Sequence, residues 1–463
     1  MSNKYDYDVI IIGGGPAGIF TALELIKAEK ACKILLLEKG KSIENRHCVS
    51  SEKGQKCIGC TPCSIMTGWG GAGAFSDGKL TLTTEFGGIL GEYITNEALM
   101  TLIEYIDSIY VDFGGTTDVH GTDNLKIRDL ERKAAAADLR FVPAKIKHLG
   151  TDKCYEILKS MQEYLHEKIE IRFLDSVEDI LVSEKTVIGI KTTKGETITS
   201  KYVVAAPGRE GSDWFRTVTK KLNLETAKNP VDIGVRVEVP AVVMQEIADA
   251  VYESKLVYYT KSFDDRVRTF CMNPSGKVVI ENTSGLKTVN GHSYKDLKTN
   301  HTNFALLVSK EFTSPFDSPI AYGKYIASLA NMLGDGVIVQ RLGDLLDGRR
   351  STTERIKRSL LQPTLPEAVP GDLSLVLPYR FLTDIIEMLQ ALDKIAPGVY
   401  SKHTLLYGVE VKFYSSRVNV SNKLETQISN LFAIGDGAGI TRGLAQASAS
   451  GVFVAREILS RLN

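Results

Sequence analysis

Three glycines near the start of the sequence have the spacing Gly-x-Gly-x-x-Gly: Gly13, Gly15 and Gly18. In this pattern the first glycine permits a tight turn after a strand, the second lets the backbone approach a pyrophosphate, and the third lets a helix pack closely. Glu38 follows at the distance where a carboxylate accepts hydrogen bonds from an adenosine ribose and disfavours a 2′-phosphate. These residues together predict a dinucleotide site.

The residues around the glycines predict the strand–helix–strand unit that such a site needs. Residues 9–12 and 34–37 are apolar runs of the kind that form buried strands, and the second run ends at Glu38. Between them, apolar residues recur at helical spacing on one face: Ile19, Ala22, Leu23 and Ile26. The start of this helix would present unpaired N–H groups and a partial positive charge to phosphates.

A second Gly-x-Gly-x-x-Gly match provides an internal comparison. Gly68, Gly70 and Gly73 have the same spacing, but no apolar strand precedes them and no helical periodicity follows. We therefore predict a loop at residues 67–73 and no second dinucleotide unit of this kind.

Two later strand ends also have the composition of a cofactor site. The run from Tyr202 to Ala206 leads into Pro207-Gly208, where small residues suit a chain that passes beside a flat cofactor; a bare strand-to-loop transition is the alternative. The run at 431–434 ends in Gly435-Asp436, and a helix of small residues follows. Asp436 could accept hydrogen bonds from a polyol chain, and the helix start could stabilise negative charge on an electron-rich ring.

The bulk composition excludes several classes of protein. The 463 residues favour two or three domains, and the 56 Lys and Arg balance 56 Asp and Glu, so no global charge attracts nucleic acid. No apolar run approaches the ~20 residues of a membrane span, and the first residues have no signal-peptide pattern. We expect a cytoplasmic protein with no nucleic-acid partner and no membrane span.

Four of the seven cysteines lie in one short segment: Cys48, Cys57, Cys60 and Cys63. Four thiolates could hold an iron–sulfur cluster or zinc, although the spacing matches no standard motif in full. A redox-active thiol pair and plain reduced cysteines are the alternatives. The metal ligands are therefore unknown, and these cysteines are weak candidates.

The pattern of apolar and polar residues changes at Asn229. Between residues 232 and 239, Val and Ile alternate with polar residues or glycine, which predicts a strand with one solvent-exposed face. Similar runs recur at 256–259, 267–272 and 278–281. We assign 229–402 to a second domain with an antiparallel sheet and added helices.

No catalytic residue can be assigned from the sequence. Weak candidates for acid–base chemistry are Asp77, Lys79, His148, His292 and His301, each of which could equally be a surface or structural residue. Cys271 could approach a cofactor from the second domain's sheet, and we assign it no role.

The sequence resembles FAD-dependent oxidoreductases of the glutathione-reductase-like flavoprotein fold. The resemblance is carried by the strand–helix–strand start, by Ala206-Pro207-Gly208 and by residues 431–438. Residues 70–80, 229–236 and 435–447 are more closely similar to a bacterial family of FAD-dependent dehydrogenases with no assigned substrate. The similarity extends nearly from end to end and implies FAD as cofactor.

The resemblance also implies roles for individual residues. The pyrophosphate would lie on Gly13, Gly14, Gly15, Pro16, Ala17 and Gly18. Glu38 would hold the ribose, with Lys39 or Arg46 beside the adenosine half and Val177 against adenine. Gly70, Gly71, Ala72 and Gly73 would lie along the pyrophosphate and flavin, and Ala206 and Gly208 beside the cofactor. Gly435 and Asp436 would bind the ribityl chain, and Gly443, Leu444, Ala445 and Gln446 would approach the flavin N1 and O2 edge.

These observations predict an α/β protein: a discontinuous Rossmann-like FAD-binding domain from residues 1–228 and 403–463, with insertions at about 41–150. An α+β antiparallel-sheet substrate or cap domain, 229–402, is inserted in it. The expected activity is hydride transfer between an organic small molecule and flavin N5, with an unidentified electron donor or acceptor. The absence of a second nucleotide unit leaves direct use of NAD(P)H open. Alternatives are an electron-transfer flavoprotein with an iron–sulfur or thiol relay at Cys57, Cys60 and Cys63, and a flavin-dependent protein that modifies or binds RNA.

Overall fold

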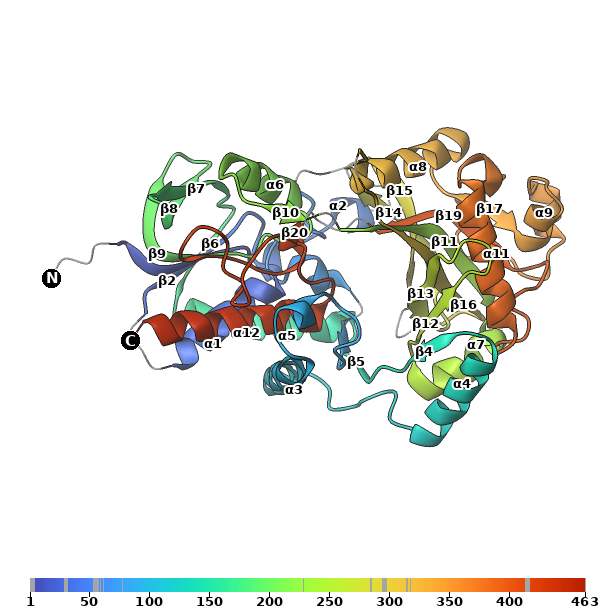
Figure 1. The fold of residues 1–463 in the computed structure, drawn as a ribbon, viewed down its shortest axis with the longest axis horizontal. Helices are drawn as coiled ribbons and strands as arrows, with labels where there is room; N and C mark the ends of the chain where they lie inside the picture. The colour runs from blue at the N-terminus through green and yellow to red at the C-terminus, as the bar shows by residue number, and fades with distance from the viewer. Residues whose placement is uncertain are drawn as a thin grey trace. The chain divides into compact units, whose positions relative to one another are not determined.

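A computed structural model describes most of the chain: residues 5–28, 32–52, 58, 60, 62–76, 78–227, 229–283, 285–293, 298–313, 315–316, 318–412 and 417–462. The chain divides into two compact units. Unit 1 comprises Met1–Asp118, Lys147–Asn229 and Tyr414–Asn463, and unit 2 comprises Val119–Ile146 and Pro230–Phe413. Figure 1 labels their helices and strands.

Unit 1 is built on a seven-stranded sheet in the order β6-β2-β1-β9-β8-β7, with β21 also paired to β9. Its parallel strands are β1 (Tyr7–Ile12), β2 (Ile34–Glu38), β6 (Glu170–Phe173), β9 (Thr197–Ala205) and β21 (Leu431–Ala433). β7 (Val177–Ser183) and β8 (Thr186–Thr192) add an antiparallel extension. The β1 and β2 runs are buried along their length, as parallel strands covered on both faces are. The predicted Rossmann-like α/β fold is confirmed.

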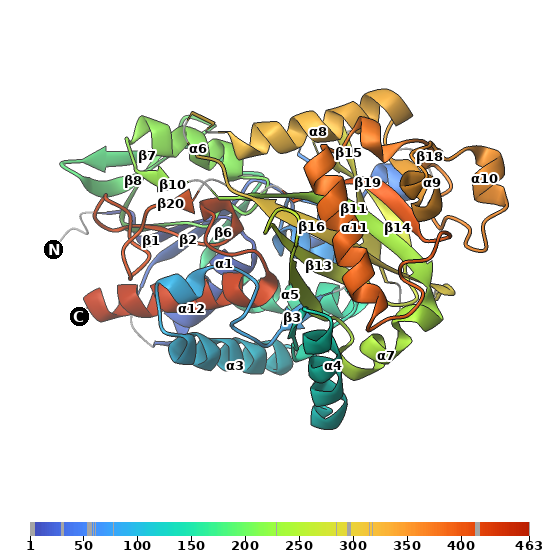
Figure 2. The same ribbon diagram turned by 45° about the vertical axis from the view of Figure 1, so that its right-hand side comes forward.

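Helices complete unit 1. The longer ones are α1 (Pro16–Lys27), α3 (Asn96–Asp112), α5 (Thr151–His166), α6 (Ser212–Lys221) and α12 (Leu444–Arg461). Short elements are η1 (Ile43–Asn45), α2 (Val49–Glu52), η2 (Gly71–Phe75), η3 (Leu90–Glu92), η5 (Asp436–Ala438), β3 (Lys79–Thr81), β5 (Ile146–His148), β10 (Thr226–Ala227) and β20 (Arg417–Val418). α1 and α12 lie side by side in both ribbon views (Figures 1 and 2), so the first and last helices of the chain share one core.

Unit 2 is built on an eight-stranded sheet in the order β18-β17-β19-β11-β16-β13-β12-β4. The strands are β4 (Arg140–Val142), β11 (Val231–Pro240), β12 (Lys255–Tyr259), β13 (Arg266–Asn273), β16 (His301–Lys310), β17 (Ile338–Arg341), β18 (Val369–Pro370) and β19 (Leu405–Lys412). A separate hairpin consists of β14 (Lys277–Thr283) and β15 (Leu286–His292). The helical elements are α4 (Asn124–Ala136), α7 (Ala241–Val251), α8 (Pro319–Gly334), α9 (Leu342–Leu346), α10 (Thr353–Lys357), η4 (Leu373–Leu375) and α11 (Tyr379–Asp393).

The extent of unit 2 differs from the predicted span of 229–402 at two places. Residues 119–146 join it because β4 pairs antiparallel with β12. Residues up to 413 also join it because β19 pairs with β11 and β17. Strand pairing across long sequence separations decides both, and no local pattern in the sequence signals it.

The prediction of a solvent-exposed face on β11 is wrong. Its alternate residues Asp232, Arg236 and Glu238 are buried, with exposed fractions of 2%, 0% and 0%. The β14–β15 hairpin covers this face: a Cβ added to Gly291 would lie 2.4 Å from Arg236 Nη1. The alternation therefore distinguishes an apolar face of β11 from a polar one, and both faces are buried.

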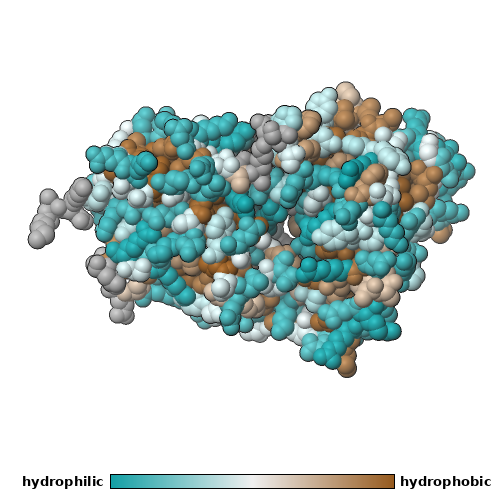
Figure 3. Space-filling view, in the orientation of Figure 1, coloured by the Kyte–Doolittle hydropathy of each residue, from teal (hydrophilic) through white to brown (hydrophobic). Residues whose placement is uncertain are grey.

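The surface of unit 2 includes an apolar strip on α8. Met332 and Leu333 are 73% and 48% exposed, and hydrophobic atoms appear over α8 in the space-filling view (Figure 3). Within the part of the chain that the structure describes, no helix has the length and apolarity that crossing a bilayer requires.

Candidate nucleotide-binding site

The glycine loop between β1 and α1 has the geometry that the sequence predicts. A Cβ on Gly18 would lie 1.9 Å from the Gly13 carbonyl oxygen, so only glycine allows this approach of helix to strand. A Cβ on Gly15 would have no heavy atom within 4 Å. Gly15 also precedes the first residue of α1, Pro16, so the open space lies at the positive end of a twelve-residue helix.

Glu38, the last residue of β2, is fixed beside this loop. Its Oε2 accepts a hydrogen bond from the Gly14 N–H and its Oε1 accepts one from the Gly40 N–H, both at 2.8 Å. The side chain is only 6% exposed. Each carboxylate oxygen can accept a further hydrogen bond, so the main chain orients Glu38 and leaves it capacity for a diol.

The second glycine-rich segment lies along the first. The Gly70 N–H donates to the Gly14 carbonyl oxygen at 2.7 Å, and a Cβ on Gly71 would be 3.5 Å from Gly15 Cα. Residues 67–70 are bends and turns, as predicted, whereas residues 71–73 of the predicted loop belong to the short 3-10 helix η2. The two glycine segments therefore line one region, with Ala72 and Gly73 following.

Arg46 has a role that the sequence does not reveal. Its guanidinium is 2% exposed and donates to the carbonyl oxygens of Ser64 at 2.8 Å, Ile65 at 2.7 Å and Gly71 at 2.8 Å, and also to that of Trp69. Burial lowers the pKa of Arg46 to about 10. The side chain therefore holds the 64–71 loop in place. A contact with the adenosine half of a cofactor remains a prediction for Arg46, as it does for Lys39, whose Nζ donates to the Glu210 carbonyl oxygen at 3.0 Å.

The remaining predicted residues of unit 1 gather around the carboxyl ends of its parallel strands. The Ala206 N–H donates to Ile12 O at 2.9 Å, which places Ala206 beside Gly13. Gly208 has φ +62° and open space around its added Cβ. The Asp175 N–H donates to Glu38 O at 3.2 Å, which brings the start of β7, Val177, to the end of β2.

The C-terminal segment contributes Asp436, which directly follows Gly435 after β21. Thr441 Oγ1 donates to its Oδ1 at 2.7 Å, and a Cβ on Gly435 would lie 3.2 Å from Ala17 Cβ. Burial raises the pKa of Asp436, with Arg209 and Arg442 acting in the opposite direction. Asp436 is thus near the start of α1.

The start of α12 is held by a segment that we did not predict. Gln446 Oε1 accepts from the Leu90 N–H at 3.2 Å, and its Nε2 donates to Phe86 O at 3.3 Å. The Arg442 N–H also donates to Gly87 O at 2.8 Å. The Gln446 side chain therefore fixes residues 86–90. The first-turn N–H groups of α12, at Leu444, Ala445 and Gln446 after Gly443, have no intrahelical acceptors and are the groups that could face a flavin.

The cysteine segment forms no visible metal centre among the described residues. Cys57 lies outside them, as does the candidate Asp77. Cys48 and Cys63 are partly buried free thiols, Cys60 is an exposed one, and no group of three or more His, Cys, Asp or Glu among the described residues could hold a metal ion. The metal, thiol-pair and reduced-cysteine alternatives stay predictions.

The other acid–base candidates are dispersed. Lys79 and His148 lie on the paired strands β3 and β5, whereas His292 and His301 lie on β15 and β16 of unit 2. We assign none of these four residues a catalytic role.

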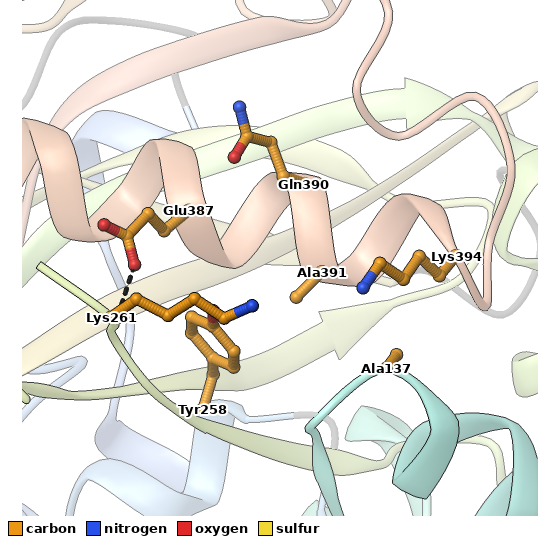
Figure 4. Close-up of a pocket in the computed structure, with 7 residues that line it drawn as sticks. All are labelled: Ala137, Tyr258, Lys261, Glu387, Gln390, Ala391 and Lys394. Carbon is orange, nitrogen blue, oxygen red and sulfur yellow. Dashed lines mark hydrogen bonds between the residues drawn. The ribbon is translucent and has the colours of Figure 1, made fainter.

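Unit 2 has a shallow pocket of about 310 Å³ beside α11 (Figure 4). Its lining residues are Ala137, Tyr258, Lys261, Glu387, Gln390, Ala391 and Lys394. The Lys261 N–H donates to Glu387 Oε2 at 2.6 Å, so the carboxylate at the pocket rim fastens the turn after β12. Five of the seven lining residues have polar side chains, and we assign the pocket no chemistry.

Two family models match the chain. Residues 230–413 match the model described as FAD-dependent protein, C-terminal domain-like, and residues 8–87 match the model described as lycopene cyclase protein. The resemblance is to FAD-dependent flavoproteins. FAD is the cofactor of this chain.

The proteins similar to this chain do not identify its substrate. A Clostridium beijerinckii protein described as uncharacterized is 26% identical over 485 residues, covering 98% of this chain and 81% of that protein. L-proline dehydrogenase from P. horikoshii has a TM-score of 0.43 and 12% identity, covering 99% of this chain and 94% of that one. Pyridoxine 4-oxidase from Mesorbium loti has a TM-score of 0.42 and 11% identity, covering 98% and 99%.

The geometry of unit 1 fits FAD. The open space at Gly15 and the start of α1 suit a pyrophosphate, and the Glu38 carboxylate suits a ribose diol. Gly71, Ala72 and Gly73 are small and half-buried, so their main chain lies close to this region. The groups available to a cofactor are thus mainly backbone N–H donors, together with two carboxylate acceptors, Glu38 and Asp436, that suit hydroxyl groups.

Proposed function

We propose that this protein is an FAD-dependent oxidoreductase that passes hydride between an organic small molecule and flavin N5, in exchange with a separate electron donor or acceptor. The observation that carries the proposal is the convergence in unit 1 of Gly15, Glu38, Asp436 and the start of α12, drawn from both ends of the chain. Bound FAD would supply the hydride-accepting centre and the electron storage.

The chain's own residues would bind and orient that cofactor. Gly13 to Gly18 would hold the pyrophosphate on backbone N–H groups, with Pro16 and Ala17 opening α1. Glu38, already oriented by the Gly14 and Gly40 amides, would accept from the ribose hydroxyls. The adenosine half would then lie at the end of β2.

The flavin half would be held by the C-terminal segment. Asp436 would accept from the ribityl hydroxyls, and the first-turn N–H groups of α12 would face the N1 and O2 edge. Because a helix N-terminus favours nearby negative charge, these N–H groups would stabilise negative charge at that edge of the ring. The Gln446 side chain would contribute indirectly, because it holds residues 86–90 against this helix start.

The Gly15→Val variant tests the cofactor site with little risk to the fold. Gly15 has φ −83° and ψ −178°, which any residue adopts, and its added Cβ meets no protein atom within 4 Å. We expect the variant apoprotein to unfold at the same temperature as the wild type but to bind FAD at least about tenfold more weakly, which is ~1.4 kcal/mol. Calorimetric titration of both apoproteins with FAD measures this.

The activity itself is tested separately by anaerobic mixing of the FAD-loaded protein with candidate substrates. Bleaching of the flavin absorption band by one class of organic compound would support hydride transfer. Unchanged FAD affinity in Gly15→Val would overturn the assigned site. A protein that binds FAD but is reduced only by one-electron donors would overturn the hydride proposal and favour an electron-transfer role.

A further inference from the structure

Unit 2 has a cationic surface at α9, α10 and the loop that follows α10 (Figure 2). Residues 341–360 include six Arg and Lys but three Asp and Glu. Lys402 lies against this segment, since a Cβ on Gly343 would be 2.7 Å from Lys402 Cβ. Asp372 also adjoins it, because the Gln340 amide donates both to Arg349 O and to Asp372 Oδ1. Seven cations and four carboxylates leave a net charge of three positive units.

One buried carboxylate holds the inner part of this surface together. Asp344 is fully buried; its Oδ2 accepts the Ser351 hydroxyl at 2.7 Å and its Oδ1 accepts from Arg349 Nε at 3.1 Å. Arg341 Nε and Arg355 Nε also approach the Asp344 carboxylate, at 3.3 and 4.0 Å. These three arginines therefore have a structural role, since they surround the carboxylate that joins α9 to the start of α10.

The outer cations have no such partner. The four exposed ones are Arg350, Lys357, Arg358 and Lys402. Within the part of the chain that the structure describes, none of these four side chains forms an ion pair. The positive charge also acts on His403, where burial, followed by the charges of Arg341 and Lys402, lowers the pKa. Like charges gathered in this way repel one another, and an anionic partner would offset the repulsion.

Two exposed leucines lie among these cations. Leu360 is 86% exposed, and its N–H donates to His403 Nδ1 at 3.4 Å. Leu346 is 44% exposed and lies one helical turn after Gly343, the residue packed against Lys402. A single exposed leucine is common on protein surfaces and needs no explanation. Here, however, one leucine lies on each side of the Lys402-His403 pair, so apolar and cationic side chains share one surface.

We propose that this surface binds to a lipid bilayer with anionic headgroups. The basic–leucine surface consists of Leu346, Arg350, Lys357, Arg358, Leu360 and Lys402. Its cations would lie at the lipid phosphates, and its leucines would enter the boundary between headgroups and acyl chains. Residues 341–360 contain no Phe, Tyr or Trp, whereas proteins that bind single-stranded nucleic acid stack its bases on aromatic side chains. The surface therefore suits lipid better than RNA. Its role is independent of FAD and of the hydride-transfer proposal.

Co-sedimentation of the FAD-loaded full-length protein with lipid vesicles tests the proposal. The probes are vesicles of phosphatidylglycerol and phosphatidylcholine in about equal parts, and vesicles of phosphatidylcholine alone. We expect binding to the anionic vesicles to be at least about tenfold tighter than to the neutral ones. Raising NaCl from about 0.1 M to about 0.5 M should release the protein, because salt screens the attraction. Equal affinity for both kinds of vesicle, or none for either, would overturn the proposal.

A charge variant with a matched control locates the binding surface. The test variant replaces three outer cations whose side chains have no described hydrogen bond or ion pair, by Arg350→Gln, Lys357→Gln and Lys402→Gln. We expect it to bind anionic vesicles at least about tenfold more weakly. The control removes the same charge from exposed lysines elsewhere in unit 2, by Lys145→Gln, Lys324→Gln and Lys394→Gln, and should stay within about twofold of the wild type. Equal losses in the two variants would overturn the proposal.

Leu360 distinguishes lipid from other polyanions. Leu360→Ser should bind anionic vesicles about fivefold more weakly, because it removes an apolar side chain from the bilayer boundary. In Leu360→Trp the new indole should emit at shorter wavelength when anionic vesicles are added, because it leaves water. Unchanged affinity in the first variant with unchanged emission in the second would overturn the proposal. So would a mixed-sequence RNA that binds more tightly than the vesicles and equally well to Leu360→Ser, since the surface would then serve nucleic acid.

Discussion

Glu38 of unit 1 and Glu410 of unit 2 are both buried carboxylates on β-strands, yet their surroundings differ. Glu38 is held by two main-chain amides, while Glu410 is paired in bidentate fashion with Arg236 and also approached by Lys412. The first keeps capacity to accept hydrogen bonds from a ligand. The second is satisfied within the protein. Burial of a charge alone therefore does not identify a ligand site; the remaining hydrogen-bonding capacity does.

The largest expected effect comes from breaking the buried ion pair between Arg236 and Glu410. Arg236→Met would leave Glu410 buried beside a single cation and remove donors to Asn303 and to Cys271 O. We expect a loss of about 3–5 kcal/mol in the free energy of unfolding, measured by chemical denaturation.

The double variant Arg236→Met with Glu410→Leu is the matched control. Because it removes both charges, we expect it to recover most of the lost stability. If the single and double variants were equally destabilised, the packing of the Arg236 side chain, and not its charge, would hold this face together.

The next effect comes from Arg46, a buried cation of unit 1 whose described hydrogen bonds all go to carbonyl oxygens. Arg46→Met would leave the acceptors of Ser64, Ile65, Trp69 and Gly71 without this donor, at a cost of about 3 kcal/mol in unfolding free energy. Limited proteolysis should show new cleavage within residues 64–71. Normal resistance there, together with weakened FAD binding, would instead favour the predicted direct contact with the cofactor.

A smaller effect is expected at Glu38, on binding more than on stability. Glu38→Ala should weaken FAD binding by about 1.5–3 kcal/mol, since it removes charged acceptors for the ribose. Glu410→Gln serves as the control: it should lower stability but leave the affinity for FAD within about twofold. Comparable loss of affinity in both variants, measured by titration of the apoproteins, would remove the distinction between the two carboxylates.

These contrasts show which parts of the molecule the sequence could predict. The conformation of the glycine loop and the place of Glu38 at the end of β2 were predictable because both follow from local geometry, while their contacts with FAD stay predictions. The role of Arg46 was not, because its acceptors are carbonyl oxygens 18 to 25 residues away in a segment without periodicity. The role of Gln446 was hidden in the same way, since its partners lie at residues 86 and 90.

The burial of the β11 polar face could not be predicted for a related reason. Alternation within a strand distinguishes two faces but does not show what covers each one. Here the cover is a hairpin about fifty residues further on, and the pairing partner of Arg236 lies on β19, 174 residues away. The assignment of residues 119–146 to unit 2 depends on a similarly distant pairing, between β4 and β12.

The smallest expected effect concerns a second set of buried carboxyl groups in unit 2, those of Asp265 and Asp384, which differ in how many cations they contact. Asp265 accepts from Arg380 at 2.6 and 2.9 Å and pairs with Lys310. Despite burial, these cations lower the pKa of Asp265 to about 2. Neighbouring Asp384 accepts a hydrogen bond from Thr260 Oγ1 at 2.8 Å, and burial, followed by a hydrogen bond to Asp265 and the charge of Asp265, raises its pKa to about 6.

The two carboxyls therefore give stability opposite dependences on pH. Asp384 binds its proton more tightly in the folded state than in the unfolded chain, where its pKa is about 3.9, so its stabilising effect is complete below about pH 4 and is lost as the pH rises to 6. Asp265 behaves in the reverse sense, and its contribution is lost as the pH falls from about 4 to 2. We expect the denaturation midpoint of the wild type to rise between pH 7 and pH 5 relative to Asp384→Asn, which stays neutral throughout. Parallel curves for the two proteins over that range would mean that Asp384 is ionised in the fold and that Arg380 and Lys310 satisfy both carboxylates, as Arg236 satisfies Glu410.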